Sequence, residues 1–99
     1  MLLKIYLHVM PRIKVKLFAN FREFAKTKEI DIEGGSIREV IETLCRKFPG
    51  MEKMLFKEGR LSPHINIFVN GRNILESGGL AAKLKQGDEI AVFPPVSGG

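Results

Sequence analysis

The chain has 99 residues, a formal net charge of +5, 44% hydrophobic residues and 27% charged residues. This length suits one domain with a core large enough to fold alone, and the balance of apolar and charged residues excludes a disordered chain. Because no apolar stretch is long enough to cross a bilayer and the single cysteine, Cys45, excludes an internal disulfide framework, we expect a soluble cytoplasmic protein.

Residues 1–11 stand apart, because the first regular pattern begins at Arg12. Their opening, MLLKIYLHVM, is apolar but has neither a basic start nor a small-residue cleavage site, so it is not typical of a signal peptide. Two interpretations stay open for this N-terminal extension. Either Met10 starts the native chain and residues 1–9 lie upstream of it, or these residues add a strand or pack elsewhere.

Residues 12–19 alternate apolar and polar side chains, a pattern typical of a half-buried strand. Residues 20–26 follow with apolar side chains at helical spacing and predict a short helix. Residues 28–33 alternate again, with isoleucines inward and carboxylates outward, and predict a second strand that ends at a pair of glycines.

A long helix after this strand is the clearest local signal. Ser36 and Glu39 have the spacing of a capping box, in which the serine hydroxyl accepts from the Glu39 amide and the Glu39 carboxylate accepts from the Ser36 amide. One apolar stripe follows at helical spacing: Ile37, Val40, Ile41, Leu44, Cys45 and Phe48. Pro49 and Gly50 end the helix, and the position of Cys45 on the stripe predicts a buried, unreactive thiol.

The second half of the chain predicts shorter elements. Residues 51–56 indicate a helical turn and residues 57–60 a loop. Residues 64–70 alternate as a strand, and Asn70–Gly71 predicts a two-residue hairpin turn because both residues tolerate positive φ. We expect a short strand through Ile74–Leu75 to follow.

The final strand is predicted over residues 89–93, with Ile90 and Val92 facing the core. The order of elements predicts an α+β fold, a β-grasp in which one long helix packs across a mixed sheet of four or five strands. We expect the first and last strands to lie side by side at the centre of this sheet. The predicted units are the extension over 1–11, a β-grasp domain over 12–94 and a flexible tail over 95–99.

No set of side chains in the sequence points to catalysis. His8 and His64 lie far apart without neighbouring ligands, so we expect no metal site, and the glycine pairs match no phosphate-binding loop. The basic residues are dispersed and come without an RNA-binding aromatic motif. A lysine-rich solvated surface explains them, and a surface for an acidic partner is the alternative that charge alone leaves open.

Three phenylalanines are predicted on the polar faces of their strands: Phe18, Phe68 and Phe93. If these strands are neighbours, the rings form one exposed apolar patch, and such patches mark interfaces with partners. The alternative is that loops or residues 1–9 cover them.

The chain ends in a segment suited to a narrow site. Pro94 and Pro95 lack amide protons and favour extended geometry, so the last strand stops there. The segment from Pro95 onward spans roughly 17 Å at about 3.4 Å per residue. Val96 offers one small apolar anchor, while Gly98 and Gly99 have no Cβ and fit a narrow channel. The functional group at the tip is the Gly99 carboxylate, which is inert until it is activated.

The ending GDEIAVFPPVSGG, together with the strand IKVKLFANFRE, the stretch EIDIEGGS and the hairpin VNGR, resembles the small subunit of molybdopterin synthase. That family is the molybdopterin-converting-factor sulfur carrier, one of the ubiquitin-like β-grasp proteins that also include the thiamine sulfur carrier. The resemblance covers about Arg12 to Gly99. The ending is its most specific element, and residues 1–11 have no counterpart in it.

The resemblance implies a sulfur-donating subunit whose own side chains do not react. An E1-like enzyme would adenylate the Gly99 carboxylate with ATP, and sulfur from a persulfide donor would replace AMP to leave a thiocarboxylate. The tail residues Pro95, Val96, Ser97 and Gly98 would then enter the large molybdopterin synthase subunit, which holds the active site. There the sulfur would be transferred to a pterin precursor of the molybdenum or tungsten cofactor.

The resemblance also implies a partner face at Phe18 and Phe93, to which strand alternation adds Phe68. We expect the chain itself to bind no cofactor, no nucleic acid and no membrane. Three alternatives remain: a ubiquitin-like modifier joined through Gly99 to lysines of other proteins, a sulfur donor for thiamine or tRNA thiolation, and a basic nucleic-acid-binding domain. The ending FPPVSGG favours the molybdopterin interpretation, whereas the choice of metal stays open.

Overall fold

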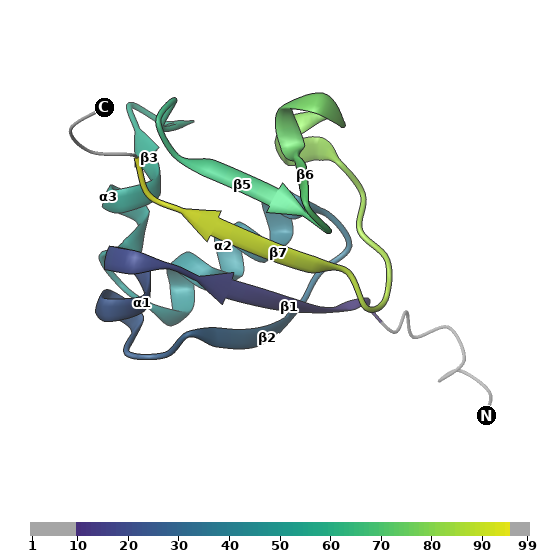
Figure 1. Ribbon diagram of the computed structural model, residues 1–99, viewed down its shortest axis with the longest axis horizontal. Coiled ribbons are helices and arrows are strands. Elements are labelled where there is room, and N and C mark those ends of the chain that lie inside the picture. The colour runs from purple at the N-terminus through teal and green to yellow at the C-terminus, as the bar shows by residue number, and fades with distance from the viewer. Residues whose placement is uncertain (1–9, 96–99) are drawn as a thin grey trace.

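A mixed sheet of five strands forms the centre of the computed structural model, which describes residues 10–95 (Figure 1). Its elements in chain order are β1 Arg12–Leu17, α1 Ala19–Ala25, β2 Glu29–Glu33, α2 Ile37–Lys47, α3 Met51–Leu55, β3 Phe56–Lys57, β4 Arg60–Leu61, β5 Asn66–Val69, β6 Arg72–Asn73, the 3-10 turns η2 Ile74–Glu76 and η3 Gly79–Ala81, and β7 Glu89–Phe93. The helix α2 packs across one face of the sheet, and the predicted β-grasp fold is confirmed.

The sheet has the strand order β2-β1-β7-β5-β6. The first and last strands, β1 and β7, run parallel at its centre as predicted, and the remaining neighbours are antiparallel. In this register Val15 lies beside Ile30 on one side and Ile90 on the other. Alternate residues of a strand point to the same face of the sheet. Val15, Ile30 and Ile90 and the residues two positions away on each strand therefore form one apolar layer.

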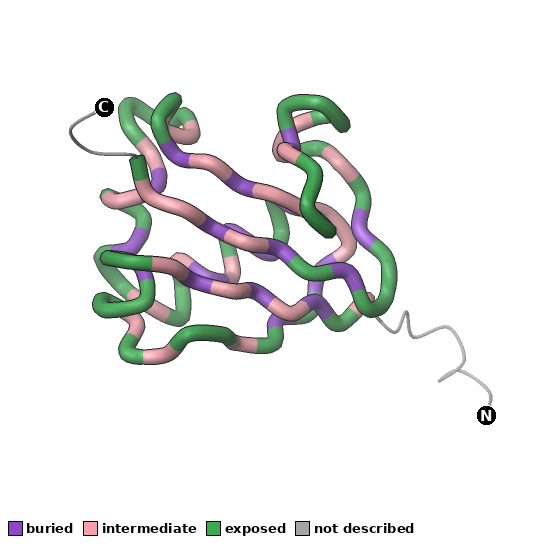
Figure 2. Tube along the Cα trace, viewed as in Figure 1, coloured by how far each residue is buried: buried purple, intermediate pink, exposed green. Residues whose placement is uncertain are grey.

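The core lies between this layer and α2. Ile13, Val15 and Leu17 of β1 are at most 1% exposed, as are Ile37, Val40, Ile41 and Leu44 of the predicted apolar stripe. The other two residues of that stripe, Cys45 and Phe48, are only partly buried. Figure 2 shows buried positions alternating with more exposed ones along β1 and β7. Within residues 10–95 no helix is long and apolar enough to span a membrane.

The cap of α2 follows the prediction on one side and departs from it on the other. The Ser36 hydroxyl accepts from the Glu39 amide at 3.2 Å, as expected. The Glu39 carboxylate, however, accepts from the amide of Gly35 at 2.7 Å and not from that of Ser36. Both contacts satisfy backbone donors that have no partner inside the helix, so the difference is a shift by one residue.

Two predictions for the second half are wrong in detail. The strand expected through Ile74–Leu75 stops at Asn73, because the Asn73 side chain accepts from the Leu75 amide at 2.9 Å and starts the turn η2. The loop expected over 57–60 is the tip of a small hairpin between β3 and β4. The two-residue turn at Asn70–Gly71 is confirmed, with φ of 51° and 84° at its two residues.

Candidate functional site

Three phenylalanine rings meet on the sheet face that α2 does not cover. Phe18 follows β1, Phe68 lies in β5 and Phe93 ends β7. The rings of Phe18 and Phe93 stack with their centroids 4.4 Å apart. The rings of Phe68 and Phe93 meet edge to face, with their centroids 5.7 Å apart. We call Phe18, Phe68 and Phe93 the aromatic cluster. Aromatic pairs favour both arrangements. The contacts confirm that the three residues lie together, as strand alternation predicted.

The aromatic cluster lines an open hollow of about 700 Å³, which we call the aromatic hollow. Ala91 of β7 and Gly71 of the hairpin turn contribute to it, and Pro94 and Pro95 form part of its wall. All three rings are only partly buried. The structure thus joins the predicted partner face to Pro95, the first residue of the predicted tail.

The remaining tail residues, Val96, Ser97, Gly98 and Gly99, lie outside the described residues, so their predicted roles stay predictions. Residues 1–9 lie outside them as well, and with them the expectation that they cover the aromatic cluster. Binding of a partner by the aromatic cluster likewise stays a prediction. Its geometry supports the prediction, because three adjoining rings at the surface are typical of interfaces.

The rest of this sheet face carries ion pairs between neighbouring strands. Lys14 pairs with Glu29 at 3.8 Å, and Lys16 with Glu89 at 3.3 Å. A third pair joins Arg12 to Glu33 at 3.8 Å. Exposed pairs of this kind contribute little to stability, but they neutralise most of the positive charge of β1. Alternation alone predicted solvated charges here. The structure adds their partners: Arg12 pairs directly across from Glu33, whereas Lys14 and Lys16 pair with carboxylates diagonal to them.

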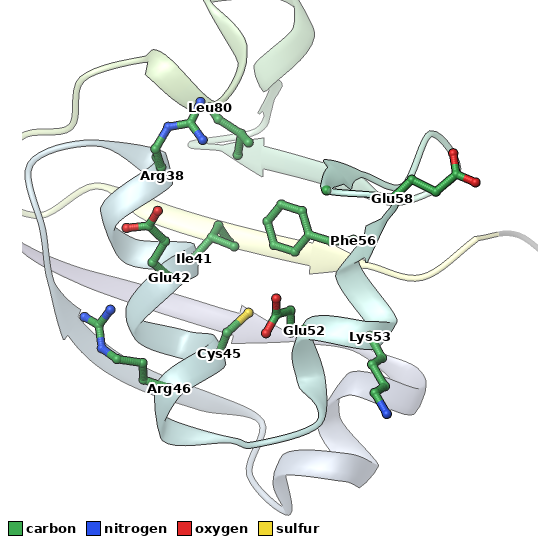
Figure 3. A pocket seen from close by; sticks show the side chains of 11 residues that line it. Arg38, Ile41, Glu42, Cys45, Arg46, Glu52, Lys53, Phe56, Glu58 and Leu80 are labelled. Atoms are coloured by element: carbon green, nitrogen blue, oxygen red, sulfur yellow. The ribbon is translucent and has the colours of Figure 1, made fainter.

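On the helix side, a hollow of about 690 Å³ lies between α2, α3 and the hairpin of β3 and β4. Figure 3 shows Cys45 of α2 and Glu52 of α3 pointing into it. The predicted burial of Cys45 is only partly correct, since its side chain lies at the margin of the stripe and is half-buried.

The chemistry of Cys45 agrees with the unreactive thiol that was predicted. Burial raises the pKa of the Cys45 thiol, and the negative charges of Glu52 and Glu42 raise that pKa further. Because the thiolate is the reactive form, this environment disfavours nucleophilic chemistry. Within the described residues, no group of three or more His, Cys, Asp or Glu side chains is placed to hold a metal ion.

Comparison with known proteins adds the family. Residues 15–99 match the profile of the ThiS family. Among solved structures, the chain is similar to small archaeal modifier protein 1 of Methanosarcina acetivorans, with 41% identity, a TM-score of 0.85, and coverage of 93% of this chain and 100% of that one. It is also similar to a Pyrococcus furiosus protein named provisionally as molybdopterin converting factor, subunit 1, with 37% identity, a TM-score of 0.71, and coverage of 87% and 99%.

Two CysO proteins complete the comparison. The sulfur carrier protein CysO of Mycobacterium tuberculosis is 32% identical over 75 residues, which cover 73% of this chain and 81% of that protein. The BexX/CysO complex of Amycolatopsis orientalis contains a chain with 31% identity, a TM-score of 0.80, and coverage of 88% and 99%. A protein similar to this one thus forms a complex with a partner. The chain belongs to the ThiS family of ubiquitin-like β-grasp proteins, whose members here are named as sulfur carriers and as small modifiers.

Proposed function

We propose that this chain is a sulfur carrier that acts through its Gly99 carboxylate and supplies molybdopterin synthase. The observation that carries the proposal is the position of Pro94 and Pro95 in the wall of the aromatic hollow. A partner seated on the aromatic cluster would meet the chain where residues 96–99 begin. The tail would then lead directly from the docking face into the partner's active site.

The chemistry needs no reacting side chain from this protein. An E1-like enzyme joins the Gly99 carboxylate to AMP from ATP, with release of pyrophosphate, and so makes the acyl carbon electrophilic. A persulfide sulfur attacks this carbon and AMP leaves; cleavage of the sulfur–sulfur bond by a thiol then leaves the thiocarboxylate on Gly99. Sulfur is a far better nucleophile than a carboxylate oxygen, which suits the transfer to a pterin precursor in the large synthase subunit.

The molybdopterin role is supported by the ending FPPVSGG and by the likeness to the provisionally named Pyrococcus furiosus protein. The likeness to small archaeal modifier protein 1 favours a second candidate. In that function the same activated Gly99 carboxylate is joined to lysine side chains of other proteins. Activation of the tail is common to both functions, and the acceptor distinguishes them.

Intact mass spectrometry of the chain from its native host tests this proposal. Replacement of one carboxylate oxygen by sulfur is expected on the full chain, and deletion of Gly99 is expected to abolish it. The same deletion is expected to leave the free energy of unfolding unchanged, because the last core residue of β7 is Val92. A truncated chain that still supported sulfuration of the pterin precursor by the large subunit would contradict the mechanism.

The products separate the two candidate functions. Transfer of the sulfur to the pterin precursor, measured with the purified large subunit, is expected for the molybdopterin role. A ladder of conjugates with isopeptide bonds at lysines, without any thiocarboxylate, would instead establish the modifier.

A further inference from the structure

A second hollow, of about 390 Å³, lies beside the hairpin of β5 and β6. Three cationic side chains line it: Arg72 from β6, and Lys83 and Lys85 from the segment between η3 and β7. We call this hollow the basic cleft. The turn Asn70–Gly71 borders both hollows, since Asn70 lines the basic cleft and Gly71 lines the aromatic hollow.

The basic cleft carries positive charge that the described residues do not neutralise. Asp88 is the one carboxylate in its lining, and it pairs with the Lys85 ammonium at 3.2 Å. Arg72 and Lys83 have no carboxylate within ion-pair distance among residues 10–95. On β1, by contrast, all three cations pair with neighbouring strands. Two of the three cations that line the basic cleft are therefore available to an acidic group of a ligand, which would complement their charge.

Backbone hydrogen bonds hold both walls of the basic cleft. On one side, the Ile37 amide donates to the carbonyl of Ala82 at 3.1 Å, and a bridge joins Ser36 to Lys83. On the other side, the Asn70 amide donates to the carbonyl of Glu89 at 2.9 Å. Because these contacts hold the backbone of the lining segments, that backbone loses little conformational entropy when a ligand binds.

An exposed apolar side chain lies in the turn that follows β6 along the chain. Leu75 in η2 is 80% exposed, and the chain reaches the basic cleft two residues later at Ser77. The lining of the cleft also includes the apolar residues Ile37, Val69 and Ala82. A ligand that combines carboxylates with an apolar side chain would contact both kinds of surface, whereas a simple inorganic anion would leave Leu75 in water.

We propose that the basic cleft is a second docking site, which receives an acidic segment of a partner protein, with an apolar side chain of that segment against Leu75. A protein segment fits better than a nucleic acid, because no aromatic ring lines the cleft to stack on a base. The shared border at Asn70–Gly71 allows one partner to occupy the aromatic hollow and the basic cleft together. The cleft would then set which partner docks, while the tail performs the chemistry.

An NMR titration of the whole isotope-labelled chain tests the site without any enzyme. The probe is a synthetic glutamate-rich peptide that contains leucines, added at an ionic strength of about 0.15 M so that long-range attraction is screened. The largest amide shifts are expected at Arg72, Ser77 and Lys83. The double variant Arg72→Glu/Lys83→Glu is expected to bind about fivefold to tenfold more weakly, and Leu75→Ser to bind more weakly than the unchanged chain.

The matched control makes the same change of charge elsewhere. Lys28→Glu/Lys57→Glu alters residues at the end of the molecule that carries α1 and β3, away from β6 (Figure 1). It is expected to leave peptide binding within about twofold of the unchanged chain. Equal weakening by both double variants, shifts spread over all basic residues, or tighter binding of a uridine oligonucleotide at the cleft would each overturn the proposal. Because sulfur loading is not used, these outcomes are independent of the proposed function.

Discussion

Asp88 connects the last strand to the hairpin turn and to the loop before β7. Its carboxylate accepts from the Lys85 amide at 2.8 Å and from the Asn70 side-chain amide at 2.9 Å. The Lys85 ammonium is a third donor at 3.2 Å. Burial of this group, which is only 5% exposed, would raise its pKa, but the three hydrogen bonds outweigh that effect and the pKa of Asp88 is lowered.

This lowered pKa predicts how stability depends on pH. The folded-state pKa lies below the unfolded value of about 3.9, so Asp88 stabilises the fold above that value and ceases to do so as the pH falls through the folded-state pKa. Asp88→Asn is therefore expected to lower the free energy of unfolding by about 1–3 kcal/mol at pH 7. In urea denaturation the difference between the two proteins is expected to shrink in strong acid.

Asp31→Asn is the control for this experiment, because Asp31 is exposed on β2 and makes no ion pair with another described residue. Its effect is expected to stay within about 0.5 kcal/mol. A loss at Asp88 that persisted unchanged in acid would show that packing, and not the charge of Asp88, provides the stability.

At the scale of elements, the hairpin of β5 and β6 depends on backbone geometry that few residues adopt. Gly71 has a φ of 84°, and a Cβ added there would meet nothing within 4 Å. Gly71→Ala is therefore expected to cost only the backbone strain, about 1–2 kcal/mol of the free energy of unfolding measured in urea. Gly35→Ala is the control, because Gly35 has no left-handed φ and a Cβ there would meet the Glu39 carboxylate at an ordinary contact distance of 3.5 Å. The free energy of unfolding of this variant is expected to change by less than about 0.5 kcal/mol. Equal losses at both glycines would contradict this account of the turn.

Periodicity was sufficient to predict the elements whose burial is regular. β1 and α2 were found because each buries one face for its whole length, and the turn at Asn70–Gly71 because its backbone geometry selects its residues. The prediction failed at Ile74–Leu75, where a single side-chain contact from Asn73 ends the strand. Periodicity does not register such a contact.

Of the two candidate sites, one could be predicted from the sequence and the other could not. The aromatic cluster was predictable, because strand alternation and the order of a β-grasp sheet together bring Phe18, Phe68 and Phe93 side by side. The basic cleft was not, because Arg72 and Lys83 come from separate segments of the chain that line one hollow only in the folded structure. The sequence raised an acidic partner as an alternative without a place for it; the tertiary fold supplies the place.

Within residues 10–95, helices cover one face of the sheet and leave the other face open. We expect the covered face to provide stability and the open face to provide recognition. α2 packs across one face of the sheet (Figure 1). That face carries Val15, Ile90 and the rest of the core, whereas the opposite face presents the aromatic cluster and paired charges. Substitutions on the two faces should therefore differ in which property they change.

Phe93→Ala tests this separation in the full chain. Because Phe93 is only partly buried and stacks on Phe18, its removal is expected to lower the free energy of unfolding by about 0.5–1.5 kcal/mol. Affinity for the E1-like activating enzyme or the large synthase subunit, measured by calorimetry, is expected to fall by about 30-fold or more, which corresponds to about 2 kcal/mol. Phe18→Asp is expected to act in the same direction.

The same substitution in the core is the control. Phe21 in α1 is fully buried, so Phe21→Ala is expected to destabilise the fold by about 3–5 kcal/mol, while the fraction that remains folded keeps its affinity for the partner. If Phe93→Ala instead lost folding stability and affinity to the same extent, the aromatic cluster would be part of the core and not a docking face. Loss of affinity with Phe93→Ala and loss of stability with Phe21→Ala would together show that one face of this sheet stabilises the fold and the other binds the partner.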